Sequence, residues 1–231
     1  MPPPIIPNED FSHSGGSIVG ARTTLGGQPV IAFFSGKCIL SNFYTTLIET
    51  SEGIFTSSEH VYTHARALYF EDEEAQREIK VADEPRDAKE WAKKVKGFDK
   101  ERWDSVKDKA MASALLHKFT QCNMLQEGLL STHPLLLVEA SPGDRYWGIG
   151  RSLKDLATGN YVTQRGQNNL GLMLMSLRTM FKNMEHENLP VNDEIVDRLV
   201  QMTKEQVQSN VPRSSRSVVR SYAAVVTHLD A

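Results

Sequence analysis

The sequence predicts a mainly helical α+β domain with a small β-sheet. Most apolar residues recur at helical spacing, and only a few short apolar runs have the composition of strands. The predicted strands do not alternate regularly with helices, as they would in a doubly wound sheet. The 231 residues, 40% hydrophobic and 24% charged, have the composition of a globular protein that can bury a core.

The chain is expected to divide into four parts. Four prolines in the first seven positions and two later Gly-Gly pairs oppose both helix and strand, so residues 1–28 are predicted to be a flexible leader. The main domain is expected over residues 29–184. A C-terminal helical extension is predicted over residues 185–208 and a flexible tail over residues 209–231.

The first elements are predicted from apolar runs and a capping signal. Pro29–Ser35 is a short run with β-branched and aromatic residues, typical of a buried strand. Tyr44–Ile54 alternates in polarity around a Glu-Gly pair, which predicts a hairpin. Thr56, followed three residues later by Glu59, has the spacing of a capping box and predicts a helix over residues 56–69.

Three helices are expected next. The first covers residues 72–82, and the second covers 85–96 with Pro85 in its first turn, where the missing N–H costs nothing. Asp99 is a suitable N-cap for the longest helix, whose apolar residues keep helical spacing as far as Phe119.

The second half of the domain is expected to add three helices and one strand. Leu135–Glu139 is a five-residue apolar run, which favours a second buried strand. The helices are predicted over Gln121–Leu130, Asn169–Asn183 and Val191–Val207, the last two with apolar residues along one face.

Composition and motifs exclude several classes of protein. The formal charge of −3 indicates no global basic field of the kind that nucleic-acid binders carry. Cys38 and Cys122 cannot form a disulfide framework and lack the spacing of zinc ligands. The chain has no signal-peptide pattern and no run of about 18 apolar residues, so we expect a soluble protein of the cytoplasm or nucleus, with no membrane partner.

The common phosphate-binding and hydrolase motifs are also missing. There is no GxGxxG after a strand, no GxxxxGK[ST], no HExxH and no GxSxG. His60 and His64 have the four-residue spacing of metal ligands on a helix, but no third ligand is near them in the sequence. We therefore expect no metal and no cofactor.

Two polar residues stand beside predicted strand ends and helix starts, where a pocket can be lined. Asn42, in the SNFY segment, could close a turn through its own side chain or hydrogen-bond ribose hydroxyls or a base amide. Glu59 is explained by the capping box, yet a carboxylate buried at a helix start could also act as a general base or stabilise a developing cation.

Two further segments allow the same pair of interpretations. Trp147 lies in the loop Ala140–Gly150, bracketed by glycines, and could fill the core or offer a face on which a nucleobase stacks. Asn168 or Asn169 could cap the helix that follows, while the amides of that helix start would equally suit a phosphate.

These segments together resemble the NADAR family, which includes the YbiA-like riboflavin-intermediate N-glycosidases. The resemblance covers about residues 30–182 and therefore leaves the leader and the tail unexplained. The matching segments, in order, are FFSGKCILSNFY, FTSSEHVYTHARALYF, the Pro85-x-x-Ala88-Lys89 step, MASALLHKF, LLSTHPLLLVEASPGDRYWGIG and GQNNLGLMLMSLR.

The resemblance implies a YbiA-like fold and hydrolysis of an N-glycosidic bond between a ribose-containing group and an amino nitrogen. The implied substrates are phosphoribosylated pyrimidine intermediates of riboflavin synthesis, or ADP-ribose attached to guanine in DNA or RNA. A ribosylated or ADP-ribosylated base, including one within DNA or RNA, is thus the expected partner, and the oligomeric state is left open.

The resemblance also implies roles for individual residues. Glu59 would stabilise the oxocarbenium-like sugar or activate water, and Asp144 or a lysine would protonate the leaving amine. Lys89 or Lys37 could capture C1 as a Schiff base, the alternative being that each is an ordinary exposed lysine. The implied substrate-binding residues are Ser41, Asn42, Phe43, His60, Trp147, Gly148, Gly166, Asn168 and Gly171.

Two departures from the family pattern concern the substrate. Gln164 stands where many relatives have Trp, and Arg151–Arg165 is longer than in compact bacterial members, which favours a larger, ADP-ribosylated substrate. Two other hypotheses stay open: a binding module for ADP-ribose or a nucleotide that no longer turns over, and an interaction protein that recruits a partner through the arginines of its tail.

Overall fold

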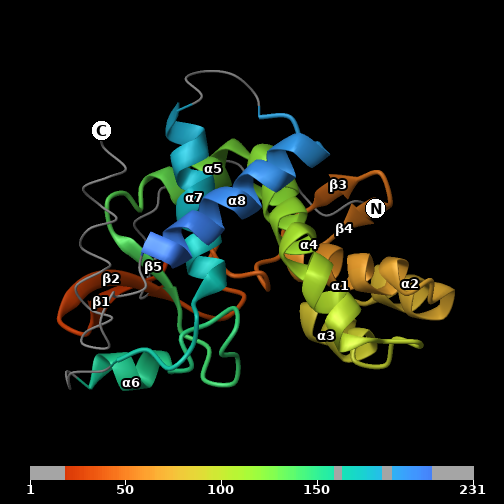
Figure 1. Cartoon of the computed structure of the whole chain (residues 1–231), viewed down its shortest axis with the longest axis horizontal. Coiled ribbons are helices and arrows are strands. Elements are labelled where there is room, and N and C mark those ends of the chain that lie inside the picture. The colour runs from red at the N-terminus through yellow and green to blue at the C-terminus, as the bar shows by residue number, and fades with distance from the viewer. Residues whose placement is uncertain (1–18, 159–162, 184–188, 210–231) are drawn as a thin grey trace.

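The computed structural model describes residues 19–158, 163–183 and 189–209 (Figure 1). The expected tail at 209–231 lies outside these residues except for its first position. In Figure 1 a small sheet lies on the left, a group of three helices on the right, and the long helix α4 between them. The predicted α+β class with a small sheet is confirmed.

The sheet contains three strands in the order β1–β2–β5. β1 (Ala21–Leu25) and β2 (Gln28–Phe33) form an antiparallel hairpin, and β2 runs parallel to β5 (Leu136–Glu139). Gly26 and Gly27 both have positive φ, at 57° and 85°, as a two-residue hairpin turn requires. The prediction that residues 1–28 form no strand is therefore wrong for β1, because the Gly-Gly pair makes a turn and does not mark disorder.

The predicted hairpin and the helix after it are both present. β3 (Ile48–Thr50) pairs with β4 (Gly53–Phe55) across a two-residue turn. α1 (Ser58–Tyr69) follows, but its N-cap is Ser57, whose hydroxyl accepts the N–H of His60. The predicted capping box with Thr56 is wrong by one residue, so the carboxylate of Glu59 is not used for capping.

The next helices match the capping signals. α2 (Glu73–Val81) and α4 (Lys100–Thr120) begin after an aspartate whose side chain accepts a backbone N–H of the first turn. α3 (Pro85–Ala92) starts at its proline as predicted and ends four residues before the expected position. Small side chains let α1, α2 and α3 pack closely; the buried cluster between them is Ala67, Ala75, Ile79, Ala88, Ala92 and Val95.

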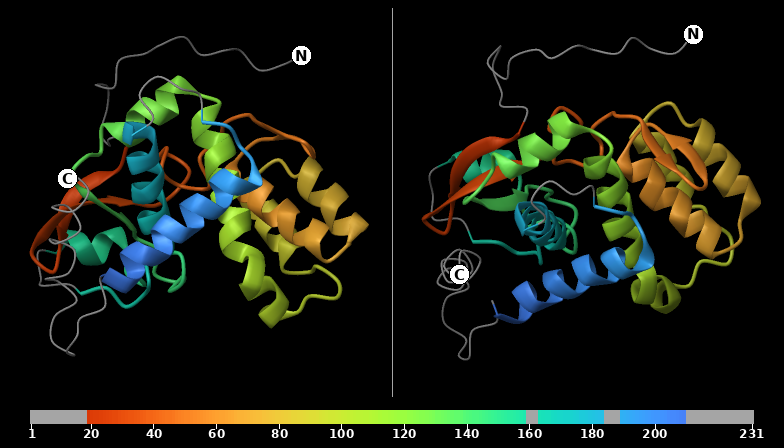
Figure 2. Two further views of the ribbon diagram at one scale, coloured as in Figure 1. Left: turned by 45° about the horizontal axis from the view of Figure 1, so that its top comes forward. Right: turned by 90° about the horizontal axis from the view of Figure 1, so that it is seen from above.

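Four further helices complete the described part of the chain. α5 (Asn123–Leu130), α7 (Asn169–Asn183) and α8 (Asp193–Ser209) were predicted, whereas the short α6 (Leu153–Ala157) was not. Ser152 and Asp155 form a reciprocal capping box at the start of α6. Figure 2 shows α8 lying across both α7 and α4.

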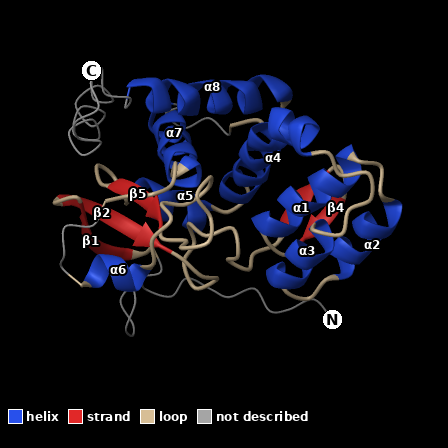
Figure 3. Ribbon diagram, turned by 60° about the horizontal axis from the view of Figure 1, so that its bottom comes forward, coloured by secondary structure: helices blue, strands red, loops and turns tan. Residues whose placement is uncertain are grey.

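The main hydrophobic core joins the sheet to α4, α5, α7 and α8 (Figure 3). α7 is buried along most of its length because it packs on β5 and is covered by α8. Two smaller clusters lie within the α1–α3 group and between the β3–β4 hairpin and α1. The boundary between the main core and the α1–α3 group is therefore where side chains of separate elements can meet.

No helix in the described ranges combines the length and the apolar composition needed to span a bilayer.

Candidate active site

A cavity of about 700 Å³ lies at one edge of the sheet. β2 and β5 are parallel, so both strands end at this edge, and the loops that follow them line the cavity from one side. α1 and α3 line it from the other side. The cavity has the size of ordinary small-molecule sites and combines apolar, aromatic and charged side chains.

Each of the two helices contributes one face to the cavity. On each helix four lining residues are spaced i, i+3, i+4 and i+7, which places their side chains on a single helical face. On α1 these residues are Glu59, Tyr62, Thr63 and Arg66; on α3 and its C-cap they are Arg86, Lys89, Glu90 and Lys93, and Ala92 also lines the cavity.

Glu59 lies at the start of α1, and its residue is only 5% exposed. Its N–H donates to the carbonyl of Asn42 at 3.0 Å, which satisfies one of the unpaired amides of the first helical turn. Its Oε1 lies 3.7 Å from Nζ of Lys89. Burial raises the pKa of Glu59, and the Lys89 ammonium opposes this rise. The structure therefore brings the predicted carboxylate and one of the predicted lysines together.

The segment after β2, residues 41–43, lies beside Glu59 and lines the cavity. Asn42 is buried and lines the cavity, and its Oδ1 accepts the hydroxyl of Ser58 at 3.2 Å. The carbonyl of Ser41 accepts a hydrogen bond from Nζ of Lys118 at 2.7 Å. Phe43 also lines the cavity, with Nζ of Lys89 5.4 Å from its ring centroid. All three predicted residues of this segment are thus at the site.

The loop after β5 places Asp144 and Trp147 in the same cavity. Oδ1 of Asp144 accepts the N–H groups of Tyr146 at 2.9 Å and Trp147 at 2.8 Å, so this carboxylate shapes the loop. The Trp147 ring is partly buried and packs edge-to-face against Tyr62, with centroids 5.8 Å apart. One face of a fixed indole in a cavity can support a flat ring.

Lys37 and His60 are not among the described residues that line the cavity. Lys37 is exposed. His60 is 1% exposed and points away, because its ring nitrogens face the Ser57 hydroxyl at 2.8 Å and the Ala82 carbonyl at 3.1 Å. Burial also lowers the pKa of His60. The roles expected for Lys37 and His60 are therefore wrong; His60 fixes the start of α1 against the segment before α3.

Asn168 does not face the cavity either. It is fully buried with φ at 59°, and its amide bridges to β5: Nδ2 donates to the Leu137 carbonyl at 2.8 Å, and Oδ1 accepts the N–H of Glu139 at 3.0 Å. The backbone amides at the start of α7 are also used, because Asn169 and Leu170 donate to carbonyls of the loop after β5. The predicted ribose contact and the predicted phosphate site at this helix start are both wrong.

The three glycines expected to bind substrate have a packing function. A side chain at Gly148 would press on the Glu139 carbonyl, one at Gly166 would overlap the Gly148 carbonyl, and one at Gly171 would overlap the Leu137 carbonyl. They let the loop after β5 and the start of α7 approach the strand closely. This layer holds the cavity wall and does not contact a ligand directly.

Sequence reasoning missed two ionisable residues beside the cavity. Glu139, the last residue of β5, lines it, and burial together with the nearby Asp144 raises the pKa of Glu139 to about 8. Lys118 lies behind it on α4, 1% exposed, and burial lowers the pKa of Lys118 to about 7. A signal was present in the sequence, because each is a charged residue within an otherwise apolar run.

Arg66 and Tyr62 were also missed, although they follow Glu59 at helical spacing. The guanidinium of Arg66 stacks 3.8 Å above the Phe98 ring, which fixes a positive charge at the cavity wall. The helix predicted from the sequence already placed these residues on the face of Glu59.

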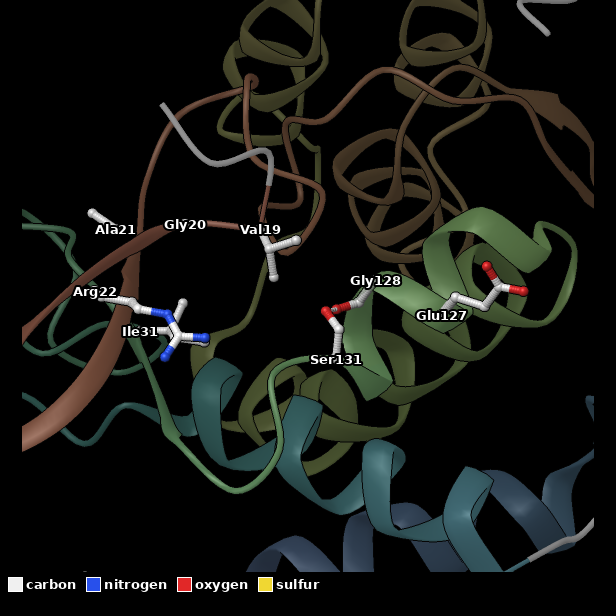
Figure 4. Close-up of a pocket in the computed structure, with 8 residues that line it drawn as sticks. All are labelled: Val19, Gly20, Ala21, Arg22, Ile31, Glu127, Gly128 and Ser131. Atoms are coloured by element: carbon white, nitrogen blue, oxygen red, sulfur yellow. Dashed lines mark hydrogen bonds between the residues drawn. The ribbon is translucent and has the colours of Figure 1, made fainter. Parts of the chain in front are cut away.

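A second cavity of about 620 Å³ lies between the β1–β2 hairpin and α5 (Figure 4). None of the predicted site residues lines it among the described residues. Arg22 and Glu127 are its charged side chains, and both are exposed. It contains no buried ionisable group and is separate from the cavity around Glu59.

The described residues contain no cluster of three or more His, Cys, Asp or Glu side chains that could hold a metal ion. His64 packs against the Phe55 ring, and burial lowers the pKa of His64 to about 4. The long segment Arg151–Arg165 contains α6, which contacts β1 through the Leu156 carbonyl and Thr23. Its described residues do not line the cavity, so they do not enlarge it for a bigger ligand.

This chain is similar to several known proteins. The family model of the NADAR domain matches residues 33–182. The N-glycosidase YbiA of Shigella flexneri is 35% identical over 138 residues, which covers 60% of this chain and 78% of that protein. Protein irg-1 of Caenorhabditis elegans is 29% identical over 199 residues, covering 78% and 88% of the two chains. The NMR structure of Escherichia coli YbiA superimposes with a TM-score of 0.56 at 30% identity, covering 74% of this chain and 94% of that one.

Proposed function

Because the chain belongs to the NADAR domain family, we infer that it is a hydrolase that cleaves N-glycosyl bonds. The observation that carries this inference is the buried carboxylate of Glu59, 3.7 Å from the Lys89 ammonium, at a cavity that also contains Trp147. A carboxylate held in this way is suited to the chemistry of a breaking glycosyl bond.

Breaking a bond between C1 of ribose and an amine nitrogen develops positive charge at the sugar, as in the hydrolysis of O-glycosides. We propose that Glu59 stabilises this charge and accepts a proton from the attacking water. Burial raises the pKa of Glu59, and the Lys89 ammonium opposes this rise and so favours the ionised form that both tasks need. The low polarity around a buried carboxylate strengthens its interaction with the sugar.

We also propose a covalent role for Lys89 as the alternative to its electrostatic one. Glu59 would first accept the proton of the Lys89 ammonium, and the neutral amine would then capture C1 of an opened sugar as a Schiff base. Lys37 is excluded from this step because its side chain is outside the cavity.

We propose that the substrate is a base that carries a ribose phosphate or ADP-ribose on an amino nitrogen. The basic residues of the two lining helices supply charge for phosphate groups. They are Arg66 on α1, Arg86 and Lys89 on α3, and Lys93 at the C-cap of α3. Trp147 would stack on the base, and Asn42 with Ser41 would contact ribose. ADP-ribosylated guanine and phosphoribosylated aminopyrimidines both satisfy this description.

The test is to incubate the purified protein with guanine-ADP-ribosylated DNA and with a phosphoribosylated aminopyrimidine. Released ADP-ribose or ribose phosphate is followed by mass spectrometry, with and without a chelator. Glu59→Gln should abolish release, while Glu52→Gln, in the exposed turn between β3 and β4, is the matched control. If neither substrate is cleaved but both bind, and Glu59→Gln leaves binding unchanged, the protein is a binding module and the proposed hydrolase activity is wrong.

A further inference from the structure

Glu139 is a buried acidic residue that the proposed reaction leaves unused. It lines the cavity, is 8% exposed, and its Oε2 is buried without a hydrogen-bond partner among the described residues. An ionised carboxylate in that position would lose its hydration without compensation, so the neutral acid is favoured. The structure thus contains a buried carboxyl group that keeps its proton beside a cavity.

The backbone of Glu139 is held on several sides. Its N–H donates to Oδ1 of Asn168 at 3.0 Å, and its carbonyl accepts the N–H of Ile149 at 2.9 Å. In the sheet it pairs with Phe33 at the end of β2. A side chain that starts from such a fixed strand end is positioned more accurately than one on a free loop.

Charged groups from each neighbouring element act on Glu139. Asp144 in the next loop and Glu59 on α1 both raise its pKa, while Lys89 on α3 and Lys118 on α4 lower it. Burial is the largest effect, and the pKa of Glu139 reaches about 8. Cys38, after β2, affects Lys118 and carries its own proton, because burial raises the pKa of the thiol to about 11.

The two buried glutamates of the cavity, Glu59 and Glu139, differ in their partners, although burial raises the pKa of both. Glu59 has an ammonium 3.7 Å from its carboxylate, whereas Oε2 of Glu139 has no such partner among the described residues. Two carboxyl groups in unlike environments are the usual basis for separating the base from the acid in one active site.

We propose that Glu139 is the general acid that protonates the leaving amine, a role for which Asp144 and the lysines were the candidates from the sequence. This inference rests on the proposed hydrolase function. Oδ1 of Asp144 is occupied by two backbone N–H groups, so Asp144 acts as a positioning residue for the loop.

In this step the C1–N bond breaks and its electron pair stays on nitrogen. The nitrogen takes the proton of Glu139 and leaves as a neutral amine. Water adds to C1 and gives its proton to Glu59, so one carboxyl group loses a proton and the other gains one. Exchange with solvent then restores both groups, and no further reactant is needed.

The experiment compares two leaving groups. The first substrate is guanine-ADP-ribosylated DNA or the phosphoribosylated aminopyrimidine, whichever the wild type cleaves, and its leaving nitrogen requires a proton. The second is 4-nitrophenyl riboside 5-phosphate, whose acidic phenol leaves with little help from a proton donor. We expect Glu139→Gln to slow amine release about 100-fold or more and nitrophenol release less than about threefold, given the usual size of general acid catalysis. Glu59→Gln should slow both.

Equal slowing of the two substrates by Glu139→Gln, or no slowing of either, would overturn the assignment. If the wild type cleaves neither substrate, the proposed function fails and this inference falls with it. Glu52→Gln is again the matched carboxylate control, and thermal melting of each variant separates a loss of catalysis from a loss of folding.

A pH profile gives a second, independent readout. The wild-type kcat/KM should fall above about pH 8 as Glu139 loses its proton. Glu139→Gln removes the titrating group, so the alkaline limb should be lost in this variant. A limb that persists in Glu139→Gln, or that is absent in the wild type, would contradict the role of Glu139.

Discussion

Oδ1 of Asn168 accepts the N–H of Glu139 at 3.0 Å and ties the start of α7 to the last residue of β5. The same amide donates to the carbonyl of Leu137 at 2.8 Å. A side chain that the sequence indicated as a ligand contact is therefore a structural link that holds an acidic residue in the cavity wall.

Replacing Asn168 should lower the stability of the fold. Asn168→Ala leaves two buried backbone groups of β5 without their partners and should reduce the free energy of unfolding by about 2–4 kcal/mol. Urea denaturation measures this loss. Asn183→Ala, at the exposed end of α7, is the control and should change the free energy of unfolding by less than about 0.5 kcal/mol.

A methyl group at Gly171 should also destabilise the protein. The added Cβ would overlap the Leu137 carbonyl, and because that atom is backbone it cannot turn aside. We expect Gly171→Ala to cost about 1–3 kcal/mol, the usual range for overpacking. Thermal unfolding that matches the wild type would show that α7 can move away from β5 without cost.

Lys89 should be essential to turnover. Lys89→Met removes the ammonium 3.7 Å from Glu59 and should lower kcat/KM by about 100-fold or more. Lys89→Arg distinguishes the two roles, because arginine keeps the charge but cannot form a Schiff base. Recovery of activity in Lys89→Arg indicates an electrostatic role, whereas no recovery, together with a borohydride-trapped adduct in the wild type, identifies a covalent one.

Arg66 should act in substrate binding and not in bond cleavage. Lysine at this position keeps the charge but loses the flat stack on Phe98, so Arg66→Lys should raise KM for a phosphorylated substrate by about tenfold. kcat should change little. Steady-state kinetics separate the two parameters, and a fall in kcat alone would be incompatible with a role in phosphate binding.

The stability of the protein should depend on the protonation of Glu139. Its pKa rises from an ordinary value of 4.5 to about 8 in the folded state, so over this range the folded chain binds more protons than the unfolded chain. The free energy of unfolding should therefore fall as the pH rises from about 4.5 to 8. Glu139→Gln should reduce this fall, as measured by urea denaturation at pH 5 and pH 8.

Lys118 should have the opposite effect on the stability of the protein, at higher pH. Burial lowers its pKa from 10.5 to about 7, so above pH 7 the folded chain binds fewer protons than the unfolded chain. This group should raise the free energy of unfolding as the pH increases from about 7 to 10.5. Lys118→Met should abolish that rise, and a variant that keeps the full rise would contradict the assignment.

Local signals predicted most of the helices correctly. Asp99 and Pro85 begin their helices as expected, because a cap or an N-terminal proline depends on the few residues beside it. The strand β1 was not predicted, because the local sequence signal beside it is ambiguous. Gly-Gly is compatible with both disorder and a hairpin turn, and only pairing with β2 decides between them.

The sequence by itself determined the fold class, the family resemblance and the segments that surround the cavity. Glu59, Lys89 and Trp147 were identified because they lie within motifs whose residue types suit the chemistry. Only the tertiary structure decided which residues face the cavity. The parallel pairing of β2 and β5 brings two distant loops to one edge, and this contact between distant parts of the chain has no local signature in the sequence.

The same pairing decides the roles of the remaining residues. It directs Asn168 and the three glycines into a packed layer behind β5, and it places Glu139 at the cavity. Burial, which depends on the whole fold, then sets the pKa of Glu139. An amide or carboxyl group has the same chemistry in any sequence, but its surroundings decide whether it supports the backbone or acts on a substrate.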